Sequence, residues 1–103
     1  MQDAAEKSAK TQVIKEKKIQ EPKNYRIVFL NDNYTTQDFV VEILILIFHL
    51  SAEDANRVMM NVHLNGRGSV GCYTLDIAQT KANQVHTIAR KNEFPLSCLI
   101  EEI

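Results

Sequence analysis

The apolar run Phe39–Leu50, FVVEILILIFHL, constrains the fold more than any other part of the sequence. A helix made from it would be apolar nearly all round, so it must be covered on more than one side. The run is about a dozen residues long and carries Glu42, which makes it too short for a membrane span. Its ILILIF alternation would also suit a strand. A capping box of Thr35 and Asp38 favours a helix over residues 36–49.

The other elements follow from capping residues and from the spacing of apolar side chains. The alternation in Tyr25–Leu30 predicts a strand with at least one fully buried face. Ser51 and Asp54 form a second capping box, which opens a helix that runs to about Val62. After the turn NGRGS, VGCYT predicts a short strand, Thr74 can cap a third helix, and LSCLIEEI predicts a closing strand.

The order of these elements is β-α-α-β-α-β. It predicts an α+β fold in which three helices pack on a small three-stranded, mostly antiparallel sheet. Gly71 in the second strand suggests a bulge or a close approach of another group. Residues at helical spacing should face the core: Ala55, Val58, Met59 and Val62 in the second helix, and Ala78, Ala82, Val85 and Ala89 in the third.

The 103 residues suit one folded domain, which we place at residues 25–103, after a tail at residues 1–24. The tail lacks periodicity and holds six Lys against four acids, a balance of +2, so we expect it to be solvated and flexible. The whole chain has a formal charge of −1, which does not indicate a nucleic-acid surface.

We expect a cytoplasmic protein that does not associate with membranes. The first ten residues contain no apolar core typical of a secretory signal. Cys72 and Cys98 form no CxxC pair and lie in strand-like stretches, where buried, reduced thiols are expected.

Catalytic and metal-binding patterns are missing from the sequence. It contains no GxSxG, P-loop, HExxH or paired-cysteine motif. His49, His63 and His86 lack the spacing of metal ligands. We therefore expect neither an enzyme nor a cofactor.

One group of residues would form a site if the first two helices make a hairpin. The start of the first helix would then lie near the end of the second, which carries Met59, Val62 and His63. Asn31 and Asp32 precede the first helix, so an amide, a carboxylate and an imidazole would rim an apolar hole. Such a rim suits a ligand with an ammonium group and an apolar side group. The alternative is structural: Asx residues in a turn, and a histidine at a helix C-terminus.

A resemblance favours the first interpretation. NYRIVFLNDNYTTQDFVVEIL, VMMNVHLNGRGSVG, LDIAQTKANQV and ARKNEFPLSCLIEEI resemble the ClpS family of Clp protease adaptor proteins, in the right order, from about Pro22 to Ile103. The resemblance implies the same β-α-α-β-α-β fold. It also implies an adaptor that recognises proteins beginning with Leu, Phe, Tyr or Trp and delivers them to a ClpA- or ClpC-type AAA+ unfoldase.

The resemblance also assigns roles to residues. Asn31, Asp32 and His63 would hold the free α-ammonium and the first peptide group. Asp76 and Lys81 would lie on the surface that faces the unfoldase, although a solvated helix start and a surface lysine would explain them equally. The side-chain pocket would be lined by Thr35, Gln37, Val40, Met59, Val62 and Leu96.

One departure from the family pattern concerns specificity. The family usually has Thr-Pro-Met after the tyrosine, and here Thr36 and Gln37 follow Thr35. Proline at the first helical turn only presets the backbone, so Thr36 should be tolerated. Gln37 replaces a methionine at the pocket rim and should alter the side-chain preference.

We expect a monomeric adaptor, and two other functions compete with this one. The first is an interaction domain that docks on the unfoldase but binds no N-terminal residue. The second is a small hydrolase that uses His63 and Asp32, although no nucleophile stands next to that pair in the sequence.

Overall fold

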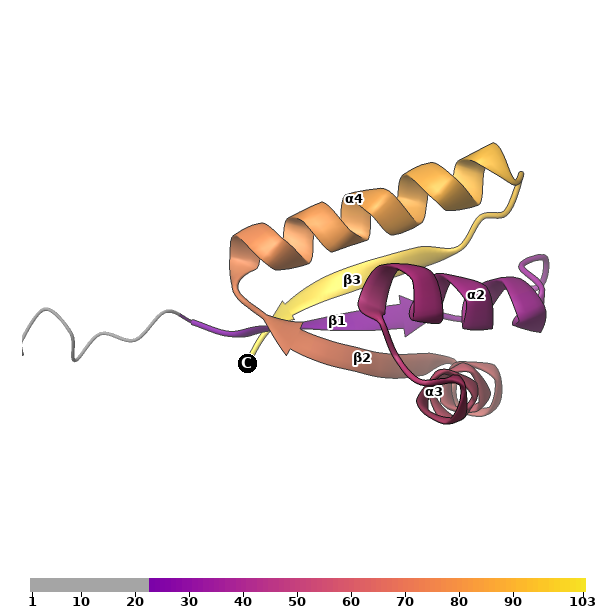
Figure 1. Ribbon diagram of the computed structural model, residues 1–103, viewed down its shortest axis with the longest axis horizontal. Helices are drawn as coiled ribbons and strands as arrows, with labels where there is room; N and C mark the ends of the chain where they lie inside the picture. Colours follow the sequence, from indigo (N-terminus) through magenta and orange to yellow (C-terminus); the bar gives the residue numbers. More distant parts are fainter. Residues whose placement is uncertain (1–22) are drawn as a thin grey trace, which may run out of the picture.

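The computed structural model describes residues 23–103, and most of the proposed tail lies outside this range. Its elements follow the predicted β-α-α-β-α-β order (Figure 1). None of the helices within residues 23–103 is long and apolar enough to cross a membrane. The elements are β1 (Tyr25–Leu30), α2 (Gln37–Phe48), α3 (Ala52–Asn65), β2 (Arg67–Tyr73), α4 (Leu75–Lys91) and β3 (Ser97–Glu102).

The three strands form an antiparallel sheet in the order β2-β1-β3, with β1 in the centre. Ile27 pairs with Gly71 and Val28 with Ser69, so Val70 is an extra residue in β2. This bulge confirms the prediction made from Gly71. One hydrogen bond continues the pairing of β1 with β3 past the ends of both strands: the Ile103 N–H donates to the Asn24 carbonyl at 3.0 Å.

The core lies between the helices and the sheet face that carries Ile27 and Phe29, both fully buried. The inward faces predicted for the second and third helices are confirmed residue by residue. Phe29 meets Phe48 of α2 edge to face, with ring centroids 5.6 Å apart. The apolar run is covered less completely than predicted, because Leu46 remains 62% exposed.

Two helix boundaries differ from the predictions. The N-cap of α2 is Thr36 and not Thr35: the Thr36 hydroxyl accepts from the Phe39 N–H at 3.2 Å. The Ser51 cap of α3 is confirmed, but this helix continues past Val62 to Asn65 and ends at Gly66, which has a left-handed φ of 84°. An extra turn of α3 therefore lies beside the loop that precedes α2.

Gly68 allows α3 to lie close against β2. A β-carbon at this position would lie 2.7 Å from Cγ2 of Val62 and 3.2 Å from the carbonyl oxygen of Val58. Real side chains do not tolerate the shorter of these distances, so a larger residue would displace the Val62 side chain or α3 itself.

The two cysteines have different environments. Both are free, and Cys98 is buried as predicted, which raises the pKa of its thiol to about 11. The prediction of a buried thiol is wrong for Cys72, because it lies on edge strand β2 and is exposed. Cys98 lies beside α4, where the ring of His86 accepts a hydrogen bond from the Cys98 backbone N–H at 3.1 Å.

Candidate ligand-binding site

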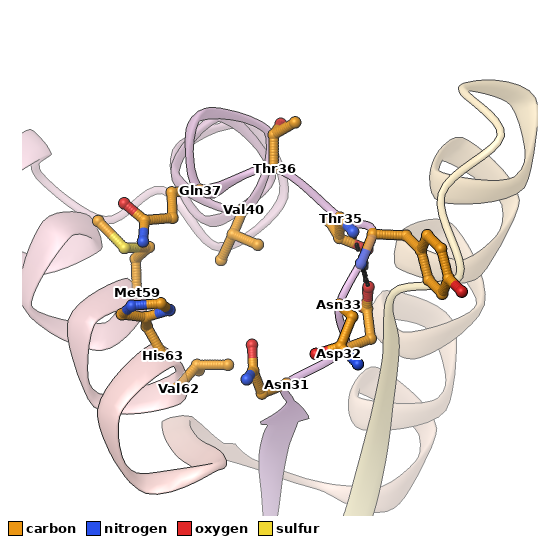
Figure 2. Close-up of a pocket in the computed structure, with 11 residues that line it drawn as sticks. Asn31, Asp32, Asn33, Thr35, Thr36, Gln37, Val40, Met59, Val62 and His63 are labelled. Carbon is orange, nitrogen blue, oxygen red and sulfur yellow. Dashed lines mark hydrogen bonds between the residues drawn. The ribbon is translucent and has the colours of Figure 1, made fainter.

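A cavity of about 440 Å³ opens where β1 ends and the chain turns into α2 (Figure 2). Its volume is within the range of about 300–1,000 Å³ that is usual for sites that bind small ligands. As predicted, the start of α2 and the end of α3 form two of its walls, but the two helices cross steeply instead of forming a hairpin: α2 lies in the plane of the view and α3 is seen end-on (Figure 1). The lining residues are Asn31, Asp32, Asn33, Tyr34, Thr35, Thr36, Gln37, Val40, Met59, Val62 and His63.

The floor of the cavity is apolar and rigid. Val40 comes from the first turn of α2, and Met59 and Val62 lie one turn apart on α3. All three side chains are also part of the hydrophobic core, with exposed fractions of 3% to 8%. A ligand group that reaches the floor would therefore meet hydrocarbon that is held in place by the rest of the fold.

Asn31 and His63 both line the cavity, Asn31 at the end of β1 and His63 on α3, with Val62 between them in the view of Figure 2. The Asn31 backbone N–H donates to the carbonyl of Gly66 at 2.9 Å, which fastens the end of β1 to the end of α3. His63 lies one turn after Met59 on the same helix face. Within residues 23–103, neither side chain makes a hydrogen bond to another protein group. Both polar groups are therefore free to accept from a ligand.

The Asp32 carboxylate faces its own loop. Oδ1 accepts from the backbone N–H of Tyr34 at 2.8 Å and of Thr35 at 2.6 Å, and Oδ2 accepts from the Thr35 hydroxyl at 2.7 Å. Partial burial alone would raise the pKa of Asp32, but these bonds, helped by the charge of Arg90, hold it below its usual value. The carboxylate is thus ionised at neutral pH.

The rest of the rim comes from the loop and the first turn of α2. Asn33, Tyr34 and Thr36 line the cavity but were not predicted as site residues. The sequence feature that could have identified these three residues is their position in the same loop as Asn31 and Asp32. Thr35 and Gln37 line the cavity as expected.

Leu96 is the one predicted pocket residue that does not line this cavity. It is 1% exposed and belongs to the core, and it does not line the cavity. Its carbonyl accepts a hydrogen bond from the Arg90 guanidinium at 2.9 Å, which fixes the segment before β3 against the end of α4.

Asp76 and Lys81 lie on α4, which begins at the end of the molecule opposite the cavity (Figure 1). Asp76 is exposed in the first turn, where it accepts from the Thr74 hydroxyl at 2.6 Å. Lys81 is half-buried: its ammonium donates to the carbonyl of Ile47 at 2.8 Å and lies over the rings of Phe48 and Tyr73. Asp76 and Lys81 also share a shallow depression of about 280 Å³ with Ile77, Thr80 and Gln84.

The arrangement suits binding rather than metal chemistry. Across residues 23–103, no three His, Cys, Asp or Glu side chains gather closely enough to hold a metal ion. The one close Cys–His pair, Cys98 and His86, has Sγ and Nε2 3.7 Å apart. Burial raises the pKa of this thiol and lowers that of the imidazole, so the thiolate form of Cys98 is disfavoured.

Comparison with known proteins gives a consistent result. The model of the family described as "ATP-dependent Clp protease adaptor protein ClpS" matches residues 20–99. The chain is 53% identical over 88 residues to an ATP-dependent Clp protease adapter protein ClpS of Syntrophus aciditrophicus, covering 85% of this chain and 82% of that protein. It is 51% identical over 96 residues to the protein of the same name from Acetivibrio thermocellus, covering 91% and 97%.

A solved structure agrees with the fold. Agrobacterium tumefaciens ClpS2, bound to L-phenylalaninamide, superposes with a TM-score of 0.78 and is 36% identical, covering 81% of this chain and all of the other. The relatives are named as adaptors of a protease, which confirms the expectation of an adaptor protein and not an enzyme.

Proposed function

Because the chain belongs to the ClpS family of ATP-dependent Clp protease adaptors, we propose that its cavity binds the first residue of substrate proteins. The preferred first residues are Leu, Phe, Tyr and Trp. The apolar side chain enters between Val40, Met59 and Val62, while the free α-ammonium and the first peptide group meet the rim that contains Asn31, Asp32 and His63.

The main support for this proposal is that the side chains of Asn31 and His63, which can accept hydrogen bonds and have no protein partner within residues 23–103, lie above an apolar cavity floor. An ammonium has three donors and no acceptor, so it matches the Asn31 amide oxygen and the acceptor nitrogen of the His63 ring. A large apolar side chain matches the floor. L-phenylalaninamide, the ligand of the Agrobacterium relative, combines a free amine with an aromatic side group. It therefore has the two features of the proposed ligand.

Acetylation of the amine tests the proposal directly. A labelled peptide that begins with Leu should bind, and the same peptide acetylated at its N-terminus should bind about tenfold more weakly or worse, because the acetyl group removes a charge-assisted hydrogen bond. The measurement is fluorescence anisotropy with the label at the C-terminal end. Equal affinity for both peptides would refute the amine-receptor role and favour a domain that docks on the unfoldase without binding an N-terminal residue.

A matched pair of variants separates the rim from the rest of α3. His63→Ala should weaken binding of the free-amine peptide by about tenfold, because one acceptor of the ammonium is lost. Asn61→Ala changes an exposed residue on the same helix that does not line the cavity, so it should leave affinity unchanged.

The second part of the proposal concerns the partner. We assign delivery to a ClpA- or ClpC-type AAA+ unfoldase and place the contact on the start of α4, around Asp76 and Lys81. The chain acts as a monomer. The assignment of the docking face to Asp76 and Lys81 is supported by its separation from the cavity, since a substrate and an unfoldase can then bind at the same time (Figure 1).

Charge reversal tests the docking face. Asp76→Lys should abolish stimulated degradation of a Leu-starting substrate and leave peptide affinity unchanged. Glu53→Lys reverses an acid at the equivalent place in the first turn of α3 and serves as the control. The assignment would be wrong if Asp76→Lys supported degradation as well as Glu53→Lys does.

A further inference from the structure

Asp32 lies next to the free acceptor of Asn31, yet its carboxylate is turned toward another part of the loop (Figure 2). We infer that Asp32 is a positioning residue: it holds the loop of residues 31–36 in the shape that the ligand meets, and it does not bind the ammonium itself. This inference rests on the proposed function, because it divides the roles within the same site.

The hydrogen bonds of Asp32 support this role. An ionised carboxylate has about four acceptor sites, and three of those of Asp32 are used by groups of Tyr34 and Thr35 at 2.6 to 2.8 Å. Both oxygens take part. An ammonium that bound Asp32 would have to compete with donors that the chain itself supplies two and three residues later.

The bonds of Asp32 join two anchored parts of the site. On one side, the backbone of Asn31 is fastened to Gly66 at the end of α3. On the other side, Thr35 is followed by Thr36, which caps α2 and so sets the first turn from which Val40 projects. Asp32 closes the loop between these anchors. Its loss would therefore move the rim relative to the floor.

This division of roles leaves Asn31 and His63 as the groups that contact the ammonium. Both side chains line the cavity and make no hydrogen bond to another protein group within residues 23–103. The lowered pKa of Asp32 is consistent with the same assignment, because hydrogen bonds from the loop favour its ionised form in the absence of any ligand.

The conservative substitution Asp32→Asn separates position from charge. The amide oxygen of Asn can accept from the N–H groups of Tyr34 and Thr35, and its NH₂ group can donate to the Thr35 hydroxyl, which has lone pairs to accept it. The loop is then kept while the charge is removed. A positioning role predicts that Asp32→Asn binds the Leu-starting peptide within about threefold of the parent protein, whereas loss of a direct charge-assisted bond would weaken it by about tenfold or more.

Two further variants remove the loop bonds instead. Asp32→Ala deletes all three and should weaken binding by about tenfold, because the whole rim loses its support. Thr35→Val deletes only the hydroxyl bond and should give an intermediate loss. Amide hydrogen exchange at Tyr34 and Thr35 reports the loop itself, since protection of these N–H groups depends on Asp32.

The inference requires that affinity follow loop protection across the three variants. It is overturned if Asp32→Asn keeps the protected amides but loses about tenfold in affinity, or if Asp32→Ala loses protection and still binds normally. Failure of the proposed function gives a different result, because the unmodified protein would then show no preference for a Leu-starting peptide over its acetylated form.

Discussion

The depth of the apolar floor can be measured by shortening the first side chain of a bound peptide. We change the peptide and not the protein, because Val40, Met59 and Val62 are all core residues. Truncation of a buried residue such as Met59 to Ala costs about 2–5 kcal/mol of folding stability. Its effect on binding would then be mixed with partial unfolding.

The expected magnitude follows from the number of carbon atoms that reach the floor. Leu has three more side-chain carbons than Ala, and each buried CH₂ group is worth about 0.8 kcal/mol, so full burial predicts a loss of about 2.4 kcal/mol, or roughly fiftyfold in Kd. The rim residues Thr36 and Gln37 are exposed, which leaves the outer part of the cavity in contact with water. If only two carbons are buried, the loss is about 1.6 kcal/mol, or roughly fifteenfold.

The assay is a fluorescence-anisotropy titration with peptides that differ only in their first residue. Ala should bind roughly fifteen- to fiftyfold more weakly than Leu. Glu should be weaker still, because its carboxylate would be desolvated against hydrocarbon. Similar affinities for the Leu, Ala and Glu peptides would refute the assignment of this cavity to the side chain.

Three further predictions concern other parts of the chain. Gln37→Met should raise the ratio of Leu-peptide to Ile-peptide affinity, because an apolar side chain leans over the cavity mouth more readily than an amide, whose burial without a partner costs about 1–3 kcal/mol; an unchanged or lower ratio in parallel titrations would show that this residue does not gate the cavity. Deletion of residues 1–18, which lie outside the described structure, should leave peptide affinity unchanged and abolish stimulated degradation; degradation that survives the deletion would reduce the tail to a linker. Iodoacetamide at pH 8 should modify the exposed Cys72 and spare Cys98, whose burial raises its thiol pKa to about 11; mass spectrometry that finds the adduct on Cys98 in the folded protein would contradict this.

Much of the fold was predictable because the local signals agree with the tertiary structure. The inward faces of α3 and α4 follow from apolar spacing alone. Asn31 and His63 line one cavity as predicted, but they are brought together by the crossing of α2 and α3 and by the bond from the Asn31 N–H to the Gly66 carbonyl, not by a hairpin of matched helices. The chain offers few competing ways to bury these residues.

The errors arise where neighbouring residues have equal propensities. Thr35 and Thr36 are both good N-caps; in the structure the Thr35 hydroxyl donates to Asp32, and the Thr36 hydroxyl caps α2. Similarly, a lysine is expected at the surface, and its sequence context did not indicate that Lys81 would close the end of α2. The N-cap of α2 and the position of Lys81 both depend on side-chain contacts that the local sequence pattern does not indicate.

Gly68 influences the shape of the cavity although it does not line it. Val62 forms part of the floor, and it lies where a β-carbon at position 68 would collide with it at 2.7 Å. A Gly68→Ala protein would have to displace the Val62 side chain, or α3 with it. Such a shift would change the shape of the cavity floor without altering any rim residue. The shape of the cavity floor therefore depends partly on Gly68, a residue of β2 that has no side chain.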